Sequence, residues 1–219
     1  MDFYVPTYLE SDFDDSLNVN GQDCILNYNA ATPTSIKVNI NSLDFKSNMK
    51  GISDTNFAIQ VSLSSGIHKG DYLTDEANNT YLINWFPATF INCLESQIQL
   101  CSITLDIERF HNITYDSDGN SSTPNYYETI VNDIKGYYSR FGMGLYDTNS
   151  GQIGIPATQK IIVGIQYNAT TALVQISDEF TLNDTQFVIT DIDYSQIDSA
   201  TTYGILTLQA QVLEGGRRA

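Results

Sequence analysis

Two histidines, His68 and His111, are the side chains in this chain best suited to general acid–base chemistry near neutral pH. A histidine-based active site also needs a nucleophile or a metal in a recognisable arrangement. The sequence contains no G-x-S-x-G, H-E-x-x-H or P-loop pattern. His68 precedes a predicted turn and His111 follows a predicted strand, both of which are ordinary positions for a surface residue. We therefore expect no histidine-based catalysis.

Carboxylates are numerous, with 26 Asp and Glu residues, but no pair stands out as the acid and base of a glycosidase. Asp116, Asp118 and Asn120 have the alternate spacing of a calcium-binding loop. This segment lacks the glycine at the sixth loop position and the glutamate at the twelfth that an EF-hand requires. It predicts a polar loop, and we expect no metal site.

The three cysteines, Cys24, Cys93 and Cys101, are odd in number and lack C-x-x-C spacing. This pattern indicates neither a disulfide framework nor a zinc site, so we expect reduced thiols that are mostly buried. Together with the histidines and carboxylates, this pattern predicts a protein without a cofactor and without enzymatic activity; an enzyme that uses two carboxylates in one pocket is the weaker alternative.

The formal net charge of −16 opposes unaided binding to DNA, RNA or an anionic membrane, because like charges repel. A basic partner, or simple solvation of the surface, explains the acidity equally well. The first residues, MDFYVPTYLESDFDD, have neither a basic leader nor an apolar run, and no stretch of 18 apolar residues occurs. We expect neither secretion nor insertion into a membrane.

The elements that position these side chains are predicted to be β-strands. Hydrophobic residues make up 42% of the chain, while Asn, Asp, Ser and Thr crowd the segments between apolar runs. Apolar side chains alternate at residues 36–40, 57–63 and 103–107, the period of a half-buried strand. The segment 126–141, YYETIVNDIKGYYSRF, suits a helix or a strand equally. The fold class is therefore all-β, with room for one short helix.

A hairpin pattern occurs twice. Residues 69–85, KGDYLTDEANNTYLINW, and residues 177–193, SDEFTLNDTQFVITDID, each predict two strands around a polar turn. The flanking strands are also similar: NFAIQVSL matches KIIVGIQY, Tyr72-Leu73 matches Phe180-Thr181, YLINW matches FVITD, and SITLDI matches GILTLQ. This order predicts a pseudo-duplicated protein of two small β-barrels or meanders.

Composition shifts suggest the domain boundaries. We expect an acidic arm with loops over 1–33, a first β unit over 34–115, a linker or long loop over 116–125, a second β unit over 126–213 and a flexible tail over 214–219.

Two sets of residues are candidates for contact with a partner. The polar loop of the first hairpin is longer than that of the second, so it is the predicted partner-contact site; its candidate residues are Thr74, Asp75, Glu76, Asn78 and Asn79. The aromatic residues Tyr72, Tyr81 and Trp85 are the second set. Their register with neighbouring apolar positions favours a place in the core, and the alternative is a stacking platform for a carbohydrate.

Several segments resemble a group of minor structural proteins encoded beside the portal and head genes of tailed bacteriophages. In the first half these are GDYL, YLINW and FINC; in the second they are the run from IPATQKIIVGIQYNATT through FVITDIDYSQ and the closing YGILTLQAQ. The resemblance covers roughly residues 36–110 and 155–212.

This resemblance implies a virion protein of the head–tail connector, acting as an adaptor or head-closure (stopper) ring, assembled in the host cytoplasm. Its implied partners are other copies of itself, the portal, and further connector or tail proteins. Genomic DNA would pass through the ring, and acidic side chains facing the lumen would keep it from sticking. The alternative function is a carbohydrate-binding or adhesin-like β module of a tail fibre or baseplate.

Overall fold

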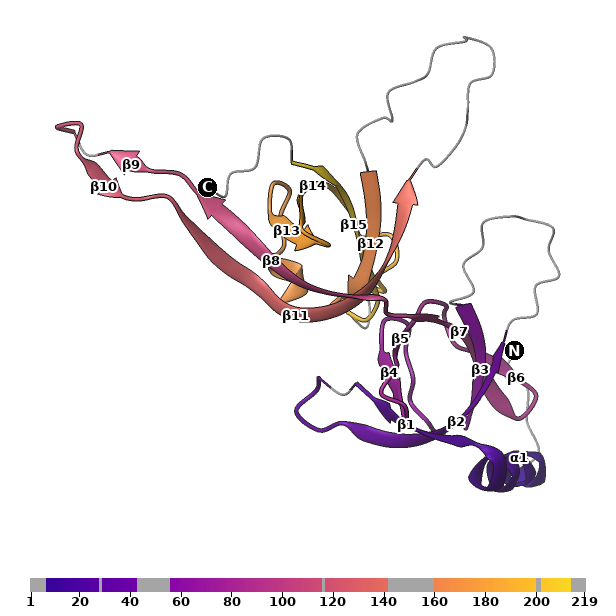
Figure 1. The fold of residues 1–219 in the computed structure, drawn as a ribbon. Helices are drawn as coiled ribbons and strands as arrows, with labels where there is room; N and C mark the ends of the chain where they lie inside the picture. The colour runs from indigo at the N-terminus through magenta and orange to yellow at the C-terminus, as the bar shows by residue number, and fades with distance from the viewer. Residues whose placement is uncertain are drawn as a thin grey trace, which may run out of the picture. The chain divides into compact units, whose positions relative to one another are not determined.

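The structure is a computed structural model, and it describes residues 7–27, 29–42, 56–115, 117–141, 160–199 and 202–213. The chain divides into two compact units. Unit 1 comprises Met1–Cys101 together with Asp198–Ile205, and unit 2 comprises Ser102–Ile197 together with Leu206–Ala219. Both units are built mainly of strands (Figure 1), which confirms the predicted all-β fold of two units.

Unit 1 is a closed barrel of six strands with a short helix before it. Strands β3, β2, β1, β4, β5 and β7 are hydrogen-bonded in that order, and pairing of β3 with β7 closes the sheet. The short strand β6 is added to the free part of the β7 edge. The elements are α1 (Thr7–Asn20), β1 (Gln22–Leu26), β2 (Thr34–Ser42), β3 (Asn56–Val61), β4 (Tyr72–Asp75), β5 (Thr80–Ile83), β6 (Ala88–Phe90) and β7 (Cys93–Leu100).

Unit 2 is also a closed six-stranded barrel, ordered β11, β12, β15, β14, β13, β8. A second, two-stranded sheet of β9 and β10 lies at the end of the β8–β11 hairpin. The elements are β8 (Ile103–His111), β9 (Thr114–Tyr115), β10 (Ser121–Thr123), β11 (Tyr126–Phe141), β12 (Lys160–Gln166), the 3-10 turn η1 (Thr171–Leu173), β13 (Glu179–Leu182), β14 (Thr185–Asp193) and β15 (Ile205–Val212).

The two barrels have the same topology. In each barrel, the first strand pairs with the second and the fourth, and the third pairs with the second and the last. The counterparts are β1 and β8, β2 and β11, β3 and β12, β4 and β13, β5 and β14, and β7 and β15. The predicted duplication is therefore confirmed at the level of strand order and pairing.

Register refines the predicted matches between the halves. Leu82 lies opposite Tyr72, and Val188 lies opposite Glu179, so YLINW and FVITD are true counterparts. The first hairpin strand is displaced by one residue, because Leu73 and not Tyr72 corresponds to Phe180. The match between SITLDI and GILTLQ is wrong: β8 opens the second barrel, and the counterpart of β15 is β7.

Alternating side chains fill both barrels, as strand geometry requires. Val38, Ile59 and Val61 are completely buried in unit 1, and Leu105 and Ile107 are buried in unit 2. The core of unit 1 consists of Cys24, Leu26, Val38, Ile59, Val61, Ile67, Leu73, Tyr81, Ile83 and Ile98. Alternation within single strands thus located the core correctly.

Three expected segment boundaries differ from the structure. The division between the units falls at residues 101 and 102, so β8 belongs to unit 2 and not to the first β unit. The described residues of 116–125 form the turn and β10 of a hairpin instead of a linker. Within the expected arm, α1 and β1 are regular elements, because Leu17 is buried and β1 pairs with both β2 and β4. The expected tail, 214–219, lies outside the described residues.

The segment 126–141 is a strand along its whole length. It pairs with β8 over its first part and with β12 over its last, so tertiary pairing resolves a pattern that local propensity left open. Register shifts between Thr129 and Ile134 mark β-bulges, and Asp133 has a φ of 53°. Bulges bend a strand, and these lie where β11 leaves the barrel.

Candidate functional site

The predicted partner-contact loop is a tight turn that satisfies much of its own hydrogen bonding. Thr74 and Asp75 belong to β4 and are only 7% and 9% exposed. The Asp75 carboxylate accepts hydrogen bonds from the Asn79 backbone N–H at 2.7 Å and from Asn79 Nδ2 at 2.9 Å. Among the five candidate residues, Glu76, Asn78 and Asn79 are exposed. Partner contact here stays a prediction, narrowed to these three side chains.

Asp75 also organises the barrel interior beneath this turn. The Tyr81 hydroxyl donates to Asp75 Oδ2 at 3.2 Å, and Cys24 lies opposite Asp75 in the β1–β4 ladder. Burial, followed by the nearby Asp75 charge, raises the pKa of Cys24 to about 12 and that of Tyr81 to about 12. A thiol with so high a pKa is a poor nucleophile, so Cys24 serves as a core residue.

A buried aspartate precedes the first hairpin strand in unit 1. Asp71 is 1% exposed and accepts hydrogen bonds from the His68 backbone N–H at 2.7 Å and from Asn27 Nδ2 at 2.8 Å. Burial raises the pKa of Asp71, and the hydrogen bonds from Asn27 and His68 oppose that rise. The residue before it, Gly70, has a φ of 90°.

Unit 2 contains the same device. Asp178 is also 1% exposed, and it accepts a hydrogen bond from the Gln175 backbone N–H at 2.8 Å. Arg109 replaces the asparagine partner, donating through Nε at 2.8 Å and through Nη2 at 3.0 Å. Ser177 stands where unit 1 has Gly70, and its φ is 79°. Each hairpin is thus tied to its own barrel by an aspartate.

Sequence reasoning missed Asp71 and Asp178, although a signal was present. Both hairpins contain an aspartate directly before their first strand, at positions that the backbone makes equivalent: Gly70 N–H bonds to Ile83 O, and Ser177 N–H bonds to Ile189 O. Their burial in a polar turn could not be inferred from composition. The signal available in the sequence was the shared aspartate at the start of both hairpins.

Each histidine lies between a tyrosine ring and a carboxylate. His68 stacks on Tyr203 with ring centroids 4.2 Å apart, and its Nδ1 lies 3.6 Å from Asp71 Oδ2. His111 stacks on Tyr126 at 4.5 Å, and its Nε2 lies 2.9 Å from Glu128 Oε2. Both histidines thus contact one aromatic ring and one carboxylate of their own unit.

The aromatic candidates divide into buried and exposed residues. Tyr72 and Tyr81 are 0% and 7% exposed, so their expected place in the core is correct. Trp85 is 60% exposed, because β5 ends at Ile83 and the alternation stops before it. Further apolar side chains are exposed around the same turn, on β6 and directly after it: Phe86, Phe90 and Ile91. Lys69 Nζ lies 4.5 Å above the Phe86 ring.

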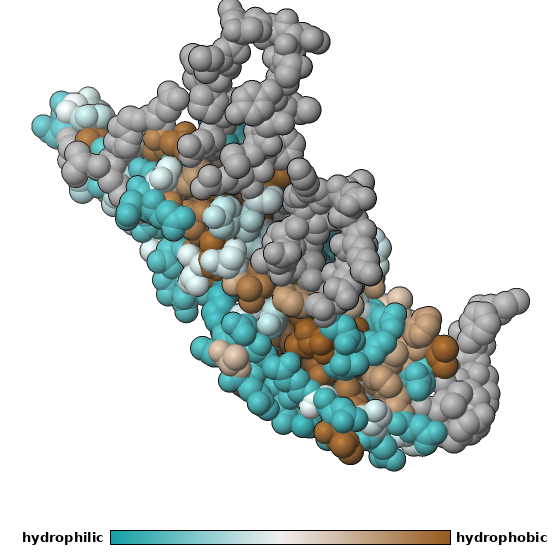
Figure 2. Space-filling model, turned by 45° about the vertical axis from the view of Figure 1, so that its right-hand side comes forward, coloured by the Kyte–Doolittle hydropathy of each residue, from teal (hydrophilic) through white to brown (hydrophobic). Residues whose placement is uncertain are grey.

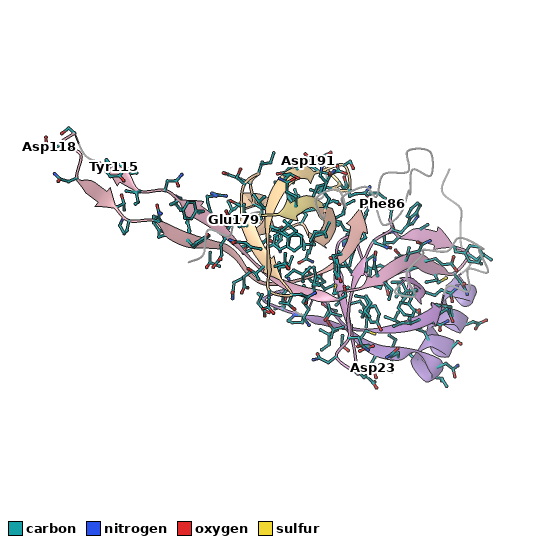
Figure 3. All side chains as sticks on the ribbon, turned by 45° about the horizontal axis from the view of Figure 1, so that its top comes forward. Asp23, Phe86, Tyr115, Asp118, Glu179 and Asp191 are labelled. Carbon is teal, nitrogen blue, oxygen red and sulfur yellow. The ribbon has the colours of Figure 1, made fainter. Side chains whose placement is uncertain are left out.

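A two-stranded ribbon extends from the barrel of unit 2 (Figure 1). We define the ribbon as residues 109–115 and 121–128, that is, the outer parts of β8 and β11 with β9 and β10. Three large apolar side chains on it are exposed: Ile113 (37%), Tyr115 (66%) and Tyr126 (47%). Tyr115 lies at its far end, next to the turn that contains Asp118 (Figure 3). Hydrophobic side chains also reach the surface elsewhere, between hydrophilic ones (Figure 2).

A loop with no charged residue lies beside the base of the ribbon. Residues 166–177, QYNATTALVQIS, contain no Asp, Glu, Lys, Arg or His. Arg109 Nη2, at the ribbon's base, donates to the Leu173 carbonyl at 2.9 Å. Leu173 and Ile176 are 59% and 58% exposed. We call residues 166–177 the uncharged loop.

Among the described residues, no group of three or more His, Cys, Asp or Glu side chains has an arrangement that would hold a metal ion. Asp118 and Asn120, from the calcium-like spacing, lie in the exposed ribbon turn, and Asp116 falls outside the described residues. The cysteines form no disulfide: Cys24 and Cys93 are buried and Cys101 is half-buried. In the part of the chain that the structure describes, no helix has the length and apolar content needed to cross a bilayer.

Comparison with known proteins gives one family match. A model of the YomX C-terminal domain matches residues 111–211, which cover most of unit 2 and a little under half of the chain. No curated protein matches. A solved structure of MrkH, a c-di-GMP-dependent transcription regulatory factor, aligns over 96% of this chain and 84% of its own, with 9% identity and a TM-score of 0.19, a value too low to bear on fold or function. Over residues 111–211, this chain is therefore similar to a phage-associated domain family.

Proposed function

We propose that this protein is a structural component of the phage head–tail interface. It forms a homo-oligomeric ring, as a connector, adaptor or head-closure component, that joins the portal to the tail. The family match over residues 111–211 supports a phage protein. The specific place at the head–tail interface rests on the sequence resemblance described above. Its role is structural and not catalytic.

The observation that carries this proposal is the ribbon of unit 2. A closed barrel has no free sheet edges, so it is a rigid support with little tendency to pair with other chains. The ribbon leaves this support and carries exposed Ile113, Tyr115 and Tyr126 into solvent. The outer part of the arm, which carries these three exposed side chains, suits contact with a neighbouring subunit.

The net charge of −16 fits passage of DNA through a ring. Phosphates that meet a negative wall are repelled, so the genome slides without adhering. We place the protein in the virion, after assembly in the host cytoplasm.

The test is assembly with the portal. The purified chain should form a ring of fixed mass in mass photometry, and electron micrographs of portal complexes should show added density at the tail-facing end of the portal. The proposal is wrong if the chain stays monomeric at every concentration and binds neither portal nor tail proteins.

The alternative is a carbohydrate-binding module, and one observation favours it. Trp85, Phe86 and Phe90 are each more than half exposed, which is the property of an aromatic platform that stacks on sugar rings. On a glycan array, specific binding that Trp85→Ala abolishes would support this function over the connector. Buried Tyr72 and Tyr81 cannot take part.

A further inference from the structure

We propose that subunits join head to tail, with the ribbon of one copy packed on the uncharged loop of the next. This inference rests on the proposed ring and names the two surfaces that build it. Both surfaces belong to unit 2, and no residue of unit 1 is required.

Among the residues that the structure describes, no third strand pairs with the ribbon. β13 reaches β8 only at Ile107 and Glu108, and β12 joins β11 only from Gly136 onward. Beyond these points, the pairing described for β8 and β11 is with each other. An isolated pair of strands is marginally stable in water, so a surface that covers one of its faces would stabilise the ribbon substantially.

The ribbon is nevertheless well ordered by its own contacts. His111 bridges the strands by stacking on Tyr126 and by its contact with Glu128. Phe110 packs on Tyr127 with ring centroids 5.1 Å apart, and Asn125 Oδ1 accepts the Ile113 N–H at 2.7 Å. A preorganised arm loses little conformational entropy when it binds, so more of its contact energy appears as affinity.

The uncharged loop is similarly held in one shape. Asn168 Oδ1 accepts the backbone N–H groups of Thr170 and Thr171, each at 2.9 Å, and Thr171 is completely buried. The Arg109 contact to the Leu173 carbonyl fixes the loop at its centre. Leu173 and Ile176 therefore project from a stiff support, which is the way apolar anchors are presented at stable interfaces.

Charge indicates that the occupant is a second copy. Two molecules with a net charge of −16 repel over most of their surfaces. They can associate without this electrostatic repulsion only through surfaces that carry few charges. The cores of protein interfaces are accordingly depleted of charged residues. The uncharged loop has none, and charge within the ribbon is confined to its base, at Arg109 and Glu128, while the turn that joins its two strands adds Asp116 and Asp118. A basic partner, by contrast, would bind the acidic parts of the surface in preference to the ribbon and the uncharged loop.

The contact is between unlike surfaces. Two ribbons packed tip to tip would bring the Asp118 carboxylates of both copies together, whereas the uncharged loop presents no carboxylate to a ribbon that packs on it. The ribbon also cannot fold onto its own loop, since Tyr115 and Asp118 lie at the end remote from the barrel that carries the loop (Figure 3). A heterologous contact of this kind propagates from copy to copy, and it closes into a ring when the rotation permits.

The decisive experiment mixes two full-length variants. The ribbon variant carries Ile113→Asp and Tyr115→Asp, and the loop variant carries Leu173→Asp and Ile176→Asp. The control variant, Val19→Asp with Ile25→Asp, adds the same charge at exposed apolar positions of unit 1. Circular dichroism and thermal melting confirm that each variant folds. Sedimentation velocity at the highest soluble concentration measures assembly.

Each defective variant alone should be monomeric, with association at least tenfold weaker than wild type, while the control assembles normally. In the mixture, the loop variant still has an intact ribbon and the ribbon variant still has an intact loop. One good contact then forms and no second one can follow, so the mixture should yield a heterodimer and nothing larger.

Three results would overturn the inference. If the ribbon or loop variant assembles like wild type, the contact lies elsewhere, although the proposed ring stands. If both variants are monomeric and their mixture gives no heterodimer, the two surfaces do not bind each other, and the ring again stands on other contacts. If the wild type itself is monomeric at all concentrations, the ring fails together with the inference.

Discussion

Asp71 and Asp178 are buried aspartates at equivalent positions directly before the first strands of the two hairpins. A carboxylate in a nearly dry site is tolerated only when hydrogen bonds replace the lost water. Unit 1 supplies these from Asn27 and a backbone amide, and unit 2 supplies them from Arg109 and a backbone amide. The buried carboxylate is thus paired with a neutral side chain, Asn27, in unit 1 and with a cation, Arg109, in unit 2.

Removing the second anchor should destabilise unit 2. Asp178→Ala leaves the Arg109 guanidinium, which is 25% exposed, without its carboxylate, and it also leaves the Gln175 N–H without its acceptor. We expect a loss of about 2–4 kcal/mol in the free energy of unfolding, measured by urea titration with circular dichroism. Asp191→Ala, at an exposed position on β14, is the control and should change little. Equal losses of stability in Asp178→Ala and Asp191→Ala would contradict the role of Asp178 as the anchor of the second hairpin.

The buried carboxyl group of Asp71 in unit 1 should make the free energy of unfolding depend on pH. Burial raises the pKa of Asp71 above its usual 3.8, so the unfolded chain releases this proton at a lower pH than the folded chain does. Between those two values the folded state binds more protons, and the stability of wild type relative to Asp71→Asn should therefore fall as the pH rises from below 3.8. Urea midpoints of both proteins from pH 3 to pH 7 measure this difference. A difference that stays constant or grows in favour of wild type refutes the raised pKa.

At the scale of elements, the equivalent turns before β4 and β13 differ in one instructive residue. Gly70 and Ser177 both have a positive φ, which glycine adopts without strain and serine does not. A side chain at position 70 would in addition overlap the Gly204 carbonyl oxygen.

Opposite substitutions at these two positions should have opposite effects. Ser177→Gly should stabilise the protein by up to about 1 kcal/mol, because it relieves backbone strain. Gly70→Ala should destabilise it by about 2 kcal/mol or more, because it adds both strain and overlap. Thermal melting of the two variants beside wild type measures both. Stabilisation by Gly70→Ala would contradict the close approach of residues 70 and 204.

The sequence predicted a strand correctly where the alternation within that single strand was enough to identify it. Alternation at 57–63 and 103–107 identified buried faces correctly, because a half-buried strand has a period of two whatever it pairs with. It could not assign β8 to its barrel, since partnership is a property of two strands. Helix α1 was missed because Leu17 is its only buried side chain among residues 11–20, too little for a helical pattern.

The candidate site was less predictable, for the same physical reason. Thr74 and Asp75 are polar residues in a polar stretch, yet strand pairing buries both. Trp85 continues an apolar alternation but lies beyond the last residue of its strand. The ribbon and the uncharged loop become recognisable as surfaces only when pairing shows where β8 and β11 have left the barrel.

At the scale of the whole molecule, the net charge of −16 makes a prediction about DNA. Gel-shift titration of linear duplex DNA at low salt should show no complex up to a protein concentration of about 10⁻⁴ M, the weak end of ordinary nonspecific binding. Low salt is the most demanding condition, because attraction to phosphates is strongest there. A complex that forms at low salt and dissociates when salt is added would show that the protein has a DNA-binding basic surface. Such a result would count against a channel wall that repels DNA.

The path of the chain between the two units has a consequence for biosynthesis. After Ile197 the chain leaves unit 2, contributes Asp198–Ile205 to unit 1, and returns to unit 2 as β15. Within unit 1 this segment supplies Tyr203, which stacks on His68, and Gly204, which lies against Gly70. A ribosome that has finished residue 101 has therefore not released a complete first unit. All six strands of the first barrel nevertheless precede residue 102, so this barrel can close during synthesis, whereas its contacts with Tyr203 and Gly204 form only after the intervening chain of unit 2 has been made.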